Sequence, residues 1–437
     1  MDAMRILHVI NNGSTCGGAE RLTADLVRAQ RAGGHDVHVL AGDRPGPGEW
    51  FADSTWPVRT ARGPARIRNF YVNQGARAAL RELLSRFAPD VVHLHTIGLL
   101  SAGALPLLRG TPTVMTVHGP EYFVGGTVRY CLPAAYFRRA DRVAGRLNAR
   151  GVAAYAWGGV VTAGLSRYLL RRHVDVFTAP SASMAGLVER SLGPTRIIRN
   201  GLDEGFRAAV RARTANPPGT GPRPLTAGAP GSRARPVTDD APASGPRLVT
   251  AGRLEDVKGV QVLLAAMPAI LAAYPEARLT VLGTGSMEDR LRRLAGELGV
   301  GPAVSWAGWS PPATMAAALA AADIAVVPSI WPESFGLTAL EALAAGCAVV
   351  AADSGGLPDL VRPGETGLLV PPGDAPALAE AVLLLLADPA LRARLAAAGT
   401  QLADQLTLTA YAEAVYAAYH DAGAADRTTS PTTVPGR

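Results

Sequence analysis

Short runs of β-branched residues alternate with amphipathic stretches along most of the 437-residue chain. In the first half this rhythm predicts strands at 5–10, 36–41, 90–95, 113–118 and 175–179, and a short strand at 196–198. In the second half it predicts strands at 247–252, 278–283, 304–308, 324–329, 348–352 and 368–370. Strands that alternate with helical patterns favour a parallel, doubly wound α/β sheet. Because the pattern occurs twice, we expect two Rossmann-like domains that face a ligand-binding cleft.

Composition suggests where these domains begin and end. We expect an N-terminal domain at 1–206 and a C-terminal domain at 247–407. The segment 207–246 is rich in Pro and Gly, has no apolar periodicity, and is predicted to be a disordered insert or linker. A helix at 408–422 is expected to cross back to the N-terminal domain, and 423–437 is expected to be a disordered tail.

The remaining bulk features concern compartment and partners. Three widely spaced cysteines fit neither a disulfide framework nor a C-x-x-C metal site. No signal-peptide pattern precedes the first strand, and no apolar run reaches the roughly 20 residues that span a bilayer. We therefore expect a cytoplasmic protein. An arginine-rich region at 129–172 is either a solvated face or a contact with anionic lipid on the inner face of the membrane. Nucleic acid is not expected as a partner.

A loop with two basic residues follows the strand predicted at 247–252. Arg253 and Lys258 bracket this loop, and a helix is predicted directly after it. Lys258 is the single lysine of a chain with 43 lysine and arginine residues. A guanidinium and an ammonium group beside a helix N-terminus suit a diphosphate. The alternative is a surface loop that kept its lysine by chance, and we favour diphosphate binding.

A second candidate is the segment 328–341, PSIWPESFGLTALE. Glu333 lies in a loop and Glu341 about two turns into a helix that starts near 335–336. A wholly helical segment would separate them by roughly 12 Å, about the reach from a hexose across a diphosphate to a ribose. Either glutamate alone would be explained as a helix cap or a solvated residue. Between them lie further candidates for donor binding, with helix N-terminal N–H groups for the phosphates: Ser334, Phe335, Gly336, Leu337 and Thr338.

Three weaker candidates complete the set. Gly17 and Gly18 follow the first strand and allow close approach of a ligand, but they do not form a dinucleotide fingerprint. His118 ends a strand, where open α/β sheets place functional residues, although a lone histidine is more often structural. Asn200 lies in a turn by composition. A structural role for this turn, as the exit toward the linker, is at least as compatible with the sequence as contact with a ligand.

No D-x-D pair follows a predicted strand, so we expect neither a metal site nor a cofactor. The charge of a departing diphosphate would then be neutralised by Arg253, Lys258 and the helix N-terminus.

Together these motifs resemble the GT4 family of retaining glycosyltransferases, which have the GT-B fold. The likeness covers nearly the whole chain except the insert and the tail. The family's paired glutamates are matched by Glu333 and Glu341, which implies contacts with the donor sugar and the ribose. Its G-R…K-G element is matched by Arg253 and Lys258, and its sugar-proximal histidine by His118.

The resemblance implies transfer of a hexosyl unit from a nucleotide diphosphate sugar to an acceptor hydroxyl. A UDP-sugar is the first choice of donor, and GDP-mannose is the second. The N-terminal domain would be the acceptor side. The acceptor would be a sugar, a lipid-linked sugar or a small molecule. A nucleotide-sugar epimerase of the same fold stays open as an alternative at this point.

Overall fold

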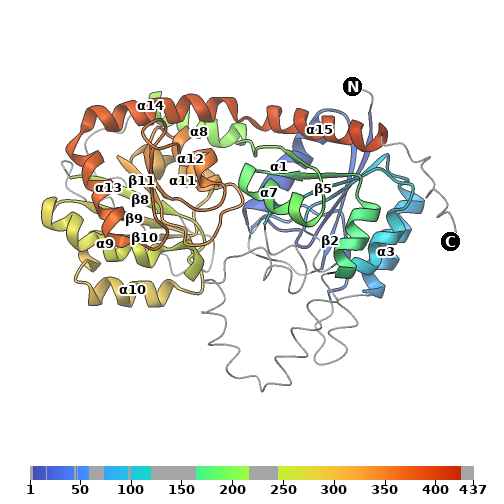
Figure 1. The fold of residues 1–437 in the computed structure, drawn as a ribbon, viewed down its shortest axis with the longest axis horizontal. Helices are drawn as coiled ribbons and strands as arrows, with labels where there is room; N and C mark the ends of the chain where they lie inside the picture. The colour runs from blue at the N-terminus through green and yellow to red at the C-terminus, as the bar shows by residue number, and fades with distance from the viewer. Residues whose placement is uncertain are drawn as a thin grey trace, which may run out of the picture. The chain divides into compact units, whose positions relative to one another are not determined.

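The computed structural model describes residues 3–15, 17–43, 46, 48–58, 73–96, 100–119, 164–215 and 245–424. The chain divides into two compact units (Figure 1). Unit 1 comprises Met1–Arg199 with Tyr411–Arg437, and unit 2 comprises Asn200–Ala410. The chain therefore passes between the units twice.

Unit 1 contains a parallel sheet with the strand order β3-β2-β1-β4-β5-β6-β7. The order reverses between β1 and β4, so the crevice beyond the carboxyl ends of these strands is the topological switch point, where such sheets bind ligands. The described strands are β1 (Arg5–Ile10), β2 (Asp36–Gly42), β3 (Ser54–Trp56), β4 (Val91–Leu94), β5 (Thr113–Thr116), β6 (Val176–Ala179) and β7 (Thr195–Ile197).

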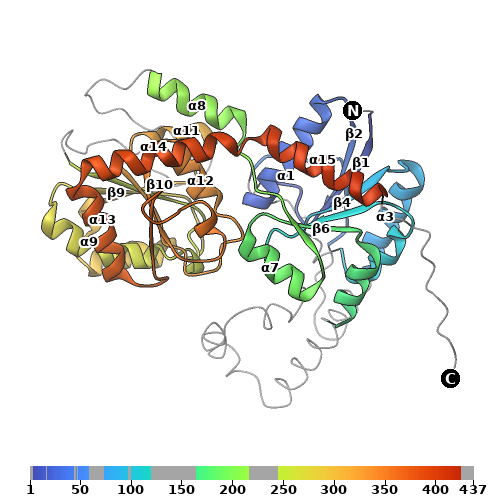
Figure 2. The ribbon, with the colours of Figure 1, turned by 45° about the horizontal axis from the view of Figure 1, so that its top comes forward.

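The two faces of this sheet differ in chemistry. On one face Leu7, Val9, Leu94 and Met115 belong to an apolar core with α3 (Gln74–Arg86), η1 (Ala102–Leu108) and α7 (Ala182–Ser191). Since successive strand residues point to opposite faces, the residues that alternate with these occupy the other face. Several of them are polar. That face lies beneath α1 (Gly18–Ala32) and α15 (Leu408–Ala424), which lie side by side (Figure 2) and are joined by a hydrogen bond from Gln30 to Tyr419.

Unit 2 repeats the same topology, with the order β10-β9-β8-β11-β12-β13 and all pairs parallel. Its switch point lies between β8 and β11. The described strands are β8 (Arg247–Ala251), β9 (Arg278–Leu282), β10 (Val304–Gly308), β11 (Ile324–Val327), β12 (Ala348–Ala352) and β13 (Leu368–Val370). The expected fold class, two doubly wound parallel α/β sheets, is confirmed.

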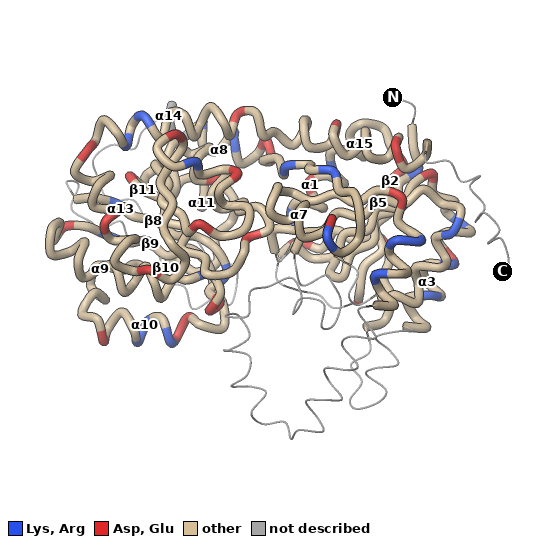
Figure 3. The backbone as a smooth tube through the Cα atoms, viewed as in Figure 1, with Lys and Arg blue, Asp and Glu red and all other residues tan. Residues whose placement is uncertain are grey.

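Helices cover both faces of the second sheet. One apolar core joins the sheet to α9 (Val260–Ala273), α10 (Glu288–Glu297) and α13 (Ala375–Ala387). The other core joins it to α8 (Glu204–Ala215), α11 (Pro312–Ala320), α12 (Leu337–Ala344) and α14 (Pro389–Gln405). Short 3₁₀ turns complete the unit: η4 (Asp256–Lys258), η5 (Gly301–Ala303) and η6 (Leu357–Asp359). Along α10, acidic and basic residues are interspersed (Figure 3), and Arg292 forms an ion pair with Glu288.

The boundary expected at 206/207 is wrong, because it falls inside α8. Phe206 and Val210, four residues apart, are both buried in the core of unit 2. Between them Arg207 is buried and its guanidinium donates to Asp404 at 2.9 Å. The arginine- and alanine-rich composition hid an amphipathic helix. Most of the expected insert (216–244) and tail (425–437) lie outside the described residues.

Among the described residues, no helix combines the length and the apolar character needed to cross a bilayer.

Candidate functional site

The centre of the site in unit 2 is an ion pair between Lys258 and Glu333. Lys258 Nζ lies 2.6 Å from Glu333 Oε1. The same oxygen accepts a hydrogen bond of 2.5 Å from the hydroxyl of Ser329. Both charged side chains are largely buried, with 28% and 14% of the side chain exposed. The two residues that the sequence singled out most strongly therefore lie in direct contact, 75 positions apart.

The backbone holds the Lys258 loop against the loop that follows β11. The carbonyl of Val257 accepts from the N–H groups of Ile330 and Trp331 at 3.0 and 3.2 Å. Gly259 has a φ of +73°, and a Cβ atom there would lie 1.8 Å from the carbonyl oxygen of Pro328. Only glycine permits this approach. The loops after β8 and β11 thus meet at the switch point of the sheet.

A second glycine loop supports Glu333 from its other side. The backbone carbonyl of Glu333 accepts from the N–H of Gly356 at 2.7 Å. Glu333 and Gly355 also form a parallel β-bridge. At Gly355, where φ is +62°, a Cβ atom would lie 2.2 Å from the Glu333 carbonyl oxygen. Glu333 is therefore fixed by its backbone as well as by its side chain.

The structure changes the expected geometry of Glu341. The helix α12 starts at Leu337, with Gly336 as its N-cap in a left-handed conformation. Glu341 is therefore the fifth residue of α12, just over one turn into it. The predicted placement two turns in was wrong, and the estimate of roughly 12 Å does not apply because Glu333 lies outside the helix. Glu341 is buried, with 3% exposed, so the alternative of a solvated residue is wrong as well.

The residues between the two glutamates have different environments. The side chain of Phe335 is buried in the apolar core, so only its backbone is available to a ligand. Ser334, Leu337 and Thr338 are partly exposed. Gly336 has no side chain with which to cap the N-terminus of α12, where Leu337 and Thr338 form the first turn. This end of the helix carries the positive partial charge of the helix dipole.

Two other candidates belong to unit 2. Arg253 is exposed in the loop between β8 and η4. Asn200 is buried, with 4% exposed, and its Oδ1 atom has no hydrogen-bond partner within the described part of the chain. A buried amide oxygen without a partner is unfavourable, and a donor on a ligand would relieve this.

Unit 1 carries the remaining candidates, which are described separately from those of unit 2. Gly17 is the N-cap of α1 and Gly18 is its first residue, so both lie at a helix N-terminus directly after β1. Gly17 has no side chain with which to cap this end, and a Cβ atom at Gly17 would lie 2.5 Å from the Glu20 carboxylate. His118 lies two residues beyond β5 and is buried, with 7% exposed.

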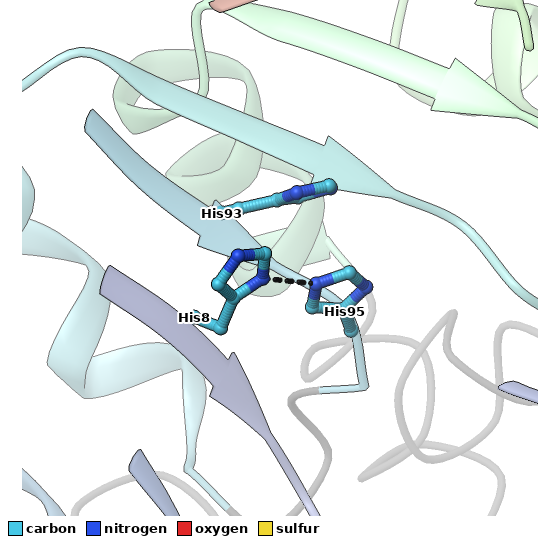
Figure 4. A group of neighbouring side chains, drawn as sticks. All are labelled: His8, His93 and His95. Atoms are coloured by element: carbon cyan, nitrogen blue, oxygen red, sulfur yellow. Dashed lines mark hydrogen bonds between the residues drawn. The ribbon is translucent and has the colours of Figure 1, made fainter. Parts of the chain in front are cut away.

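His118 is not a lone histidine, as the sequence suggested, but the end of a buried cluster. Its Nε2 atom lies 3.0 Å from His95 Nδ1, and His95 Nε2 lies 2.8 Å from His8 Nδ1. His93 lies beside His95, with ring centroids 4.0 Å apart and ring planes tilted by 33°. Figure 4 shows His8, on β1, and His93, on β4, with His95 just beyond the end of β4. The sequence analysis missed these three residues.

A signal for them is present in the sequence. His93 and His95 alternate with apolar residues in VVHLH, and His8 pairs with His93 in the register of β1 and β4. Polar residues at every second position of a strand occupy one face. Because parallel strands with helices on both sides are buried on both faces, this pattern indicates a buried polar cluster.

Burial keeps these histidines neutral. Desolvation lowers the pKa of His8 and of His118 from 6.5 to about 4. Desolvation, together with the neighbouring rings, also lowers the pKa of His93 and His95 well below 6.5. Ring nitrogens of His8, His93 and His95 lie close enough together to form a potential metal-binding group, which the sequence analysis did not expect.

Most of the arginine-rich region considered for lipid contact lies outside the described residues. Of its described members, Arg171 donates to the backbone carbonyl of Ser191 at 2.9 Å, while Arg167 and Arg172 complete the segment.

Comparison with known proteins agrees with this arrangement. Residues 16–206 match the family model described as Glycosyltransferase Family 4, and residues 239–402 match the model described as Glycosyl transferases group 1. The glycogen synthase of Mycobacterium tuberculosis (strain ATCC 25618 / H37Rv) is 31% identical over 415 residues, which is 88% of this chain and 86% of the relative.

Solved structures share the fold. Sucrose-phosphate synthase (tll1590) from Thermosynechococcus elongatus has a TM-score of 0.71 and 23% identity, covering 97% of this chain and 100% of that one. Anabaena Alr3699/HepE in complex with UDP-glucose has a TM-score of 0.63 and 19% identity, covering 95% and 98%.

Replacement of Gly355 by alanine tests the support of Glu333. Gly364→Ala is the matched control, because Gly364 also has a positive φ of +74° but no atom within 4 Å of a new Cβ. Both variants carry the backbone cost of about 1 kcal/mol. Gly355→Ala adds the clash with Glu333, so we expect a further loss of stability in urea denaturation and roughly tenfold lower kcat/KM. Equal behaviour of the two variants would contradict the role of this loop.

The buried histidines predict a pH dependence of stability. Between about pH 4 and pH 6.5 the unfolded chain binds protons that folded His8 and His118 do not, so the free energy of unfolding falls as the pH is lowered through this range. Each residue contributes a slope of about 1.4 kcal/mol per pH unit. In urea denaturation, His8→Gln should reduce this slope, whereas the variant of the exposed His420, His420→Gln, should keep it. Identical slopes in all three proteins would show that His8 is not buried and neutral.

Proposed function

The chain belongs to the family 4, group 1 glycosyltransferases, which use nucleotide sugars, and we propose that it transfers a hexosyl unit from a nucleotide diphosphate sugar to an acceptor hydroxyl with retention of configuration. The contact of Lys258 with Glu333 at the switch point of unit 2 is the observation that carries this proposal. In this proposal the cation that would bind the diphosphate lies beside the carboxylate that would bind the sugar.

Each member of the pair keeps capacity for a ligand. An ammonium group has three donors, and one is directed to Glu333. The other two are available to phosphate oxygens. The Glu333 Oε1 atom accepts from Lys258 and Ser329, which leaves Oε2 as an acceptor for donor-sugar hydroxyls. One carboxylate would thus orient both the lysine and the sugar.

The rest of the donor would lie along the same loops. The N–H groups in the first turn of α12 would donate to the diphosphate, because the N-cap Gly336 has no side chain of its own to occupy them. Arg253, exposed after β8, would bind the phosphates bidentately. In this arrangement Glu341 would accept a hydrogen bond from the ribose, and Asn200 would contact the nucleotide sugar. Gly17 and Gly18, which belong to unit 1, stay candidates for binding it on the family resemblance.

In the proposed reaction the bond between the anomeric carbon and the diphosphate oxygen breaks as an oxocarbenium-like species forms. The acceptor hydroxyl attacks from the same face, and its proton passes to the departing phosphate oxygen. No side chain needs to take that proton. Lys258 and Arg253 would stabilise the charge that develops on the diphosphate, which acts mainly on the transition state.

A UDP-sugar is our first choice of donor and GDP-mannose the second, and the UDP-glucose in the Anabaena structure supports the first. The acceptor would be a sugar, a lipid-linked sugar or a small molecule. The epimerase alternative is not retained, because both family models and the full-length relative are glycosyltransferases.

Lys258→Ala should lower kcat by roughly 10²- to 10³-fold, as loss of one group that stabilises a developing anion does. The measurement is initial-rate kinetics of sugar transfer, with thermal melting to verify folding. Arg290→Ala is the control, because it removes one positive charge from an exposed position of the same unit and should keep normal turnover. Near-normal turnover of Lys258→Ala would contradict the proposed role of the lysine.

A further inference from the structure

The histidine cluster of unit 1 is part of a longer hydrogen-bonded chain. Beyond His8, the ring Nε2 atom lies 2.7 Å from Gln30 Oε1. Gln30 Nε2 donates to the hydroxyl of Tyr419 at 3.1 Å, and that hydroxyl lies 2.7 Å from His93 Nδ1. The chain therefore runs from His118 through β4, β1, α1 and α15 and back to β4.

The far end of this chain crosses the sheet. His93 Nε2 lies 2.7 Å from the hydroxyl of Thr116, which lies 2.8 Å from the hydroxyl of Thr178. Six buried side-chain atoms of the described residues lack a hydrogen-bond partner, and none of them belongs to a residue of this hydrogen-bonded network. A buried polar network with every group paired is rigid and specifies one arrangement.

Because the histidine rings are neutral, the hydrogen bonds along this chain of side chains must all run in the same donor-to-acceptor direction. Each neutral imidazole has one N–H donor and one acceptor nitrogen. Gln30 Oε1 only accepts, so His8 Nε2 carries the proton and His8 Nδ1 accepts. His95 Nε2 must then donate to His8, and His95 Nδ1 must accept from the Nε2–H of His118. Each histidine from His8 to His118 is therefore the Nε2–H tautomer.

The other half of the chain agrees with the same direction. Burial raises the pKa of Tyr419 well above 10, so its hydroxyl keeps its proton. That hydroxyl accepts from Gln30 and donates to His93 Nδ1, so His93 Nε2 donates to Thr116. Each hydrogen bond from His118 to Thr116 thus has one donor and one acceptor.

Gln30 selects this direction. If its amide were turned around, every donor and acceptor in the chain would exchange roles, and His118 would become the Nδ1–H tautomer. The hydroxyl of Thr23 is compatible with the inferred direction, because it is 2.8 Å from the Ala19 carbonyl and 3.3 Å from His95 Nδ1 and can share its hydrogen between them.

Metal binding by His8, His93 and His95 is the competing explanation. Ligand nitrogens about 2.0–2.1 Å from a tetrahedral zinc ion are separated by about 3.3 Å. The 2.8 Å between His8 Nδ1 and His95 Nε2 is instead a hydrogen-bond distance. Both ring nitrogens of His93 already have partners, Tyr419 and Thr116. The cluster geometry therefore favours the hydrogen-bonded chain.

We propose that Gln30, through His8 and His95, holds His118 as a neutral Nε2–H imidazole whose Nδ1 accepts a hydrogen bond from a hydroxyl of the bound sugar. This inference rests on the proposed function and on the family resemblance, in which His118 matches the sugar-proximal histidine. His118 selects for a hydroxyl donor at that position of the sugar. Gln30, His8, His95 and Tyr419 are positioning residues that act through it.

The direct test is nitrogen NMR of the full chain labelled with ¹⁵N-histidine, because chemical shifts distinguish a protonated from an unprotonated ring nitrogen. Single histidine variants assign the signals. We expect His8, His95 and His118 each to have a protonated Nε2 and an unprotonated Nδ1 at neutral pH. A protonated Nδ1 at His118 would overturn the proposal.

Gln30→Glu should reverse the donor and acceptor roles in the hydrogen bonds from His8 to His118. A buried carboxylate favours a doubly protonated His8, whose Nδ1–H then donates to His95 and shifts the proton of His118 to Nδ1. We expect this shift in the spectrum together with roughly tenfold lower kcat/KM, the loss of about one hydrogen bond. Gln401→Glu, at an exposed position of α14, is the matched control and should change neither.

Tyr419→Phe is a second variant in case Gln30→Glu does not fold. It removes the acceptor of the Gln30 amide and should give a mixture of both tautomers at His118.

Unchanged kcat/KM in a variant whose His118 tautomer has shifted would overturn the role in sugar binding. One zinc ion per chain in the purified protein, lost in His93→Gln, would overturn the hydrogen-bonded chain itself. Absence of sugar transfer by the unmodified protein would instead contradict the proposed function, and the tautomer measurement does not depend on it.

Discussion

The ion pair of Lys258 with Glu333 depends on two loops that follow neighbouring strands of one parallel sheet. The loop after β8 carries the lysine, and the loop after β11 carries the glutamate. Backbone hydrogen bonds from Val257 and the close approach of Gly259 to Pro328 hold these loops together. The strand order reverses between β8 and β11, so the sheet itself creates the space in which charged side chains can converge. A cation held in this way before a ligand binds needs little rearrangement to stabilise a departing diphosphate.

Unit 1 uses the same topology for a different purpose. Its switch point, between β1 and β4, is lined by the buried histidines that end at His118. One face of this sheet is an apolar core, whereas the other holds a polar chain beneath α1 and α15. Such a chain is stable only when every member is paired, which makes the position and protonation of its last residue depend on all the others. We infer that His118 owes its chemistry to this buried support.

The sequence predicts the fold well, because alternation of strands and helices leaves a strong pattern. All twelve strands expected at the outset, including the short one at 196–198 that corresponds to β7, are present within two residues of their predicted bounds. The three-residue strand β3 (Ser54–Trp56) is too short to leave such a pattern. The helix α8 was missed because its arginines and alanines resemble the segment that follows, although Phe206 and Val210 mark its buried face.

The candidate site was predicted in part. The chemistry of Lys258 and Glu333 could be inferred from residue types and motif spacing, but their contact could not, because it joins positions 75 residues apart. The burial of Glu341 depends on the residue at which α12 starts. The presence of Gly336 in the sequence does not by itself determine that start. The chain from His118 to Tyr419 joins β4, β1, α1 and α15, and only the register of the strands and the packing of both helices bring its members together.

The central claim is that Lys258, Arg253 and the start of α12 bind a diphosphate without help from a divalent ion. Calorimetric titration of the full chain with UDP, GDP and ADP in the presence of a metal chelator tests this most directly. We predict that at least one of the three binds, and that its affinity falls as the salt concentration is raised, because charges are neutralised on binding. Failure of all three to bind, or binding only after magnesium is restored, would contradict the account.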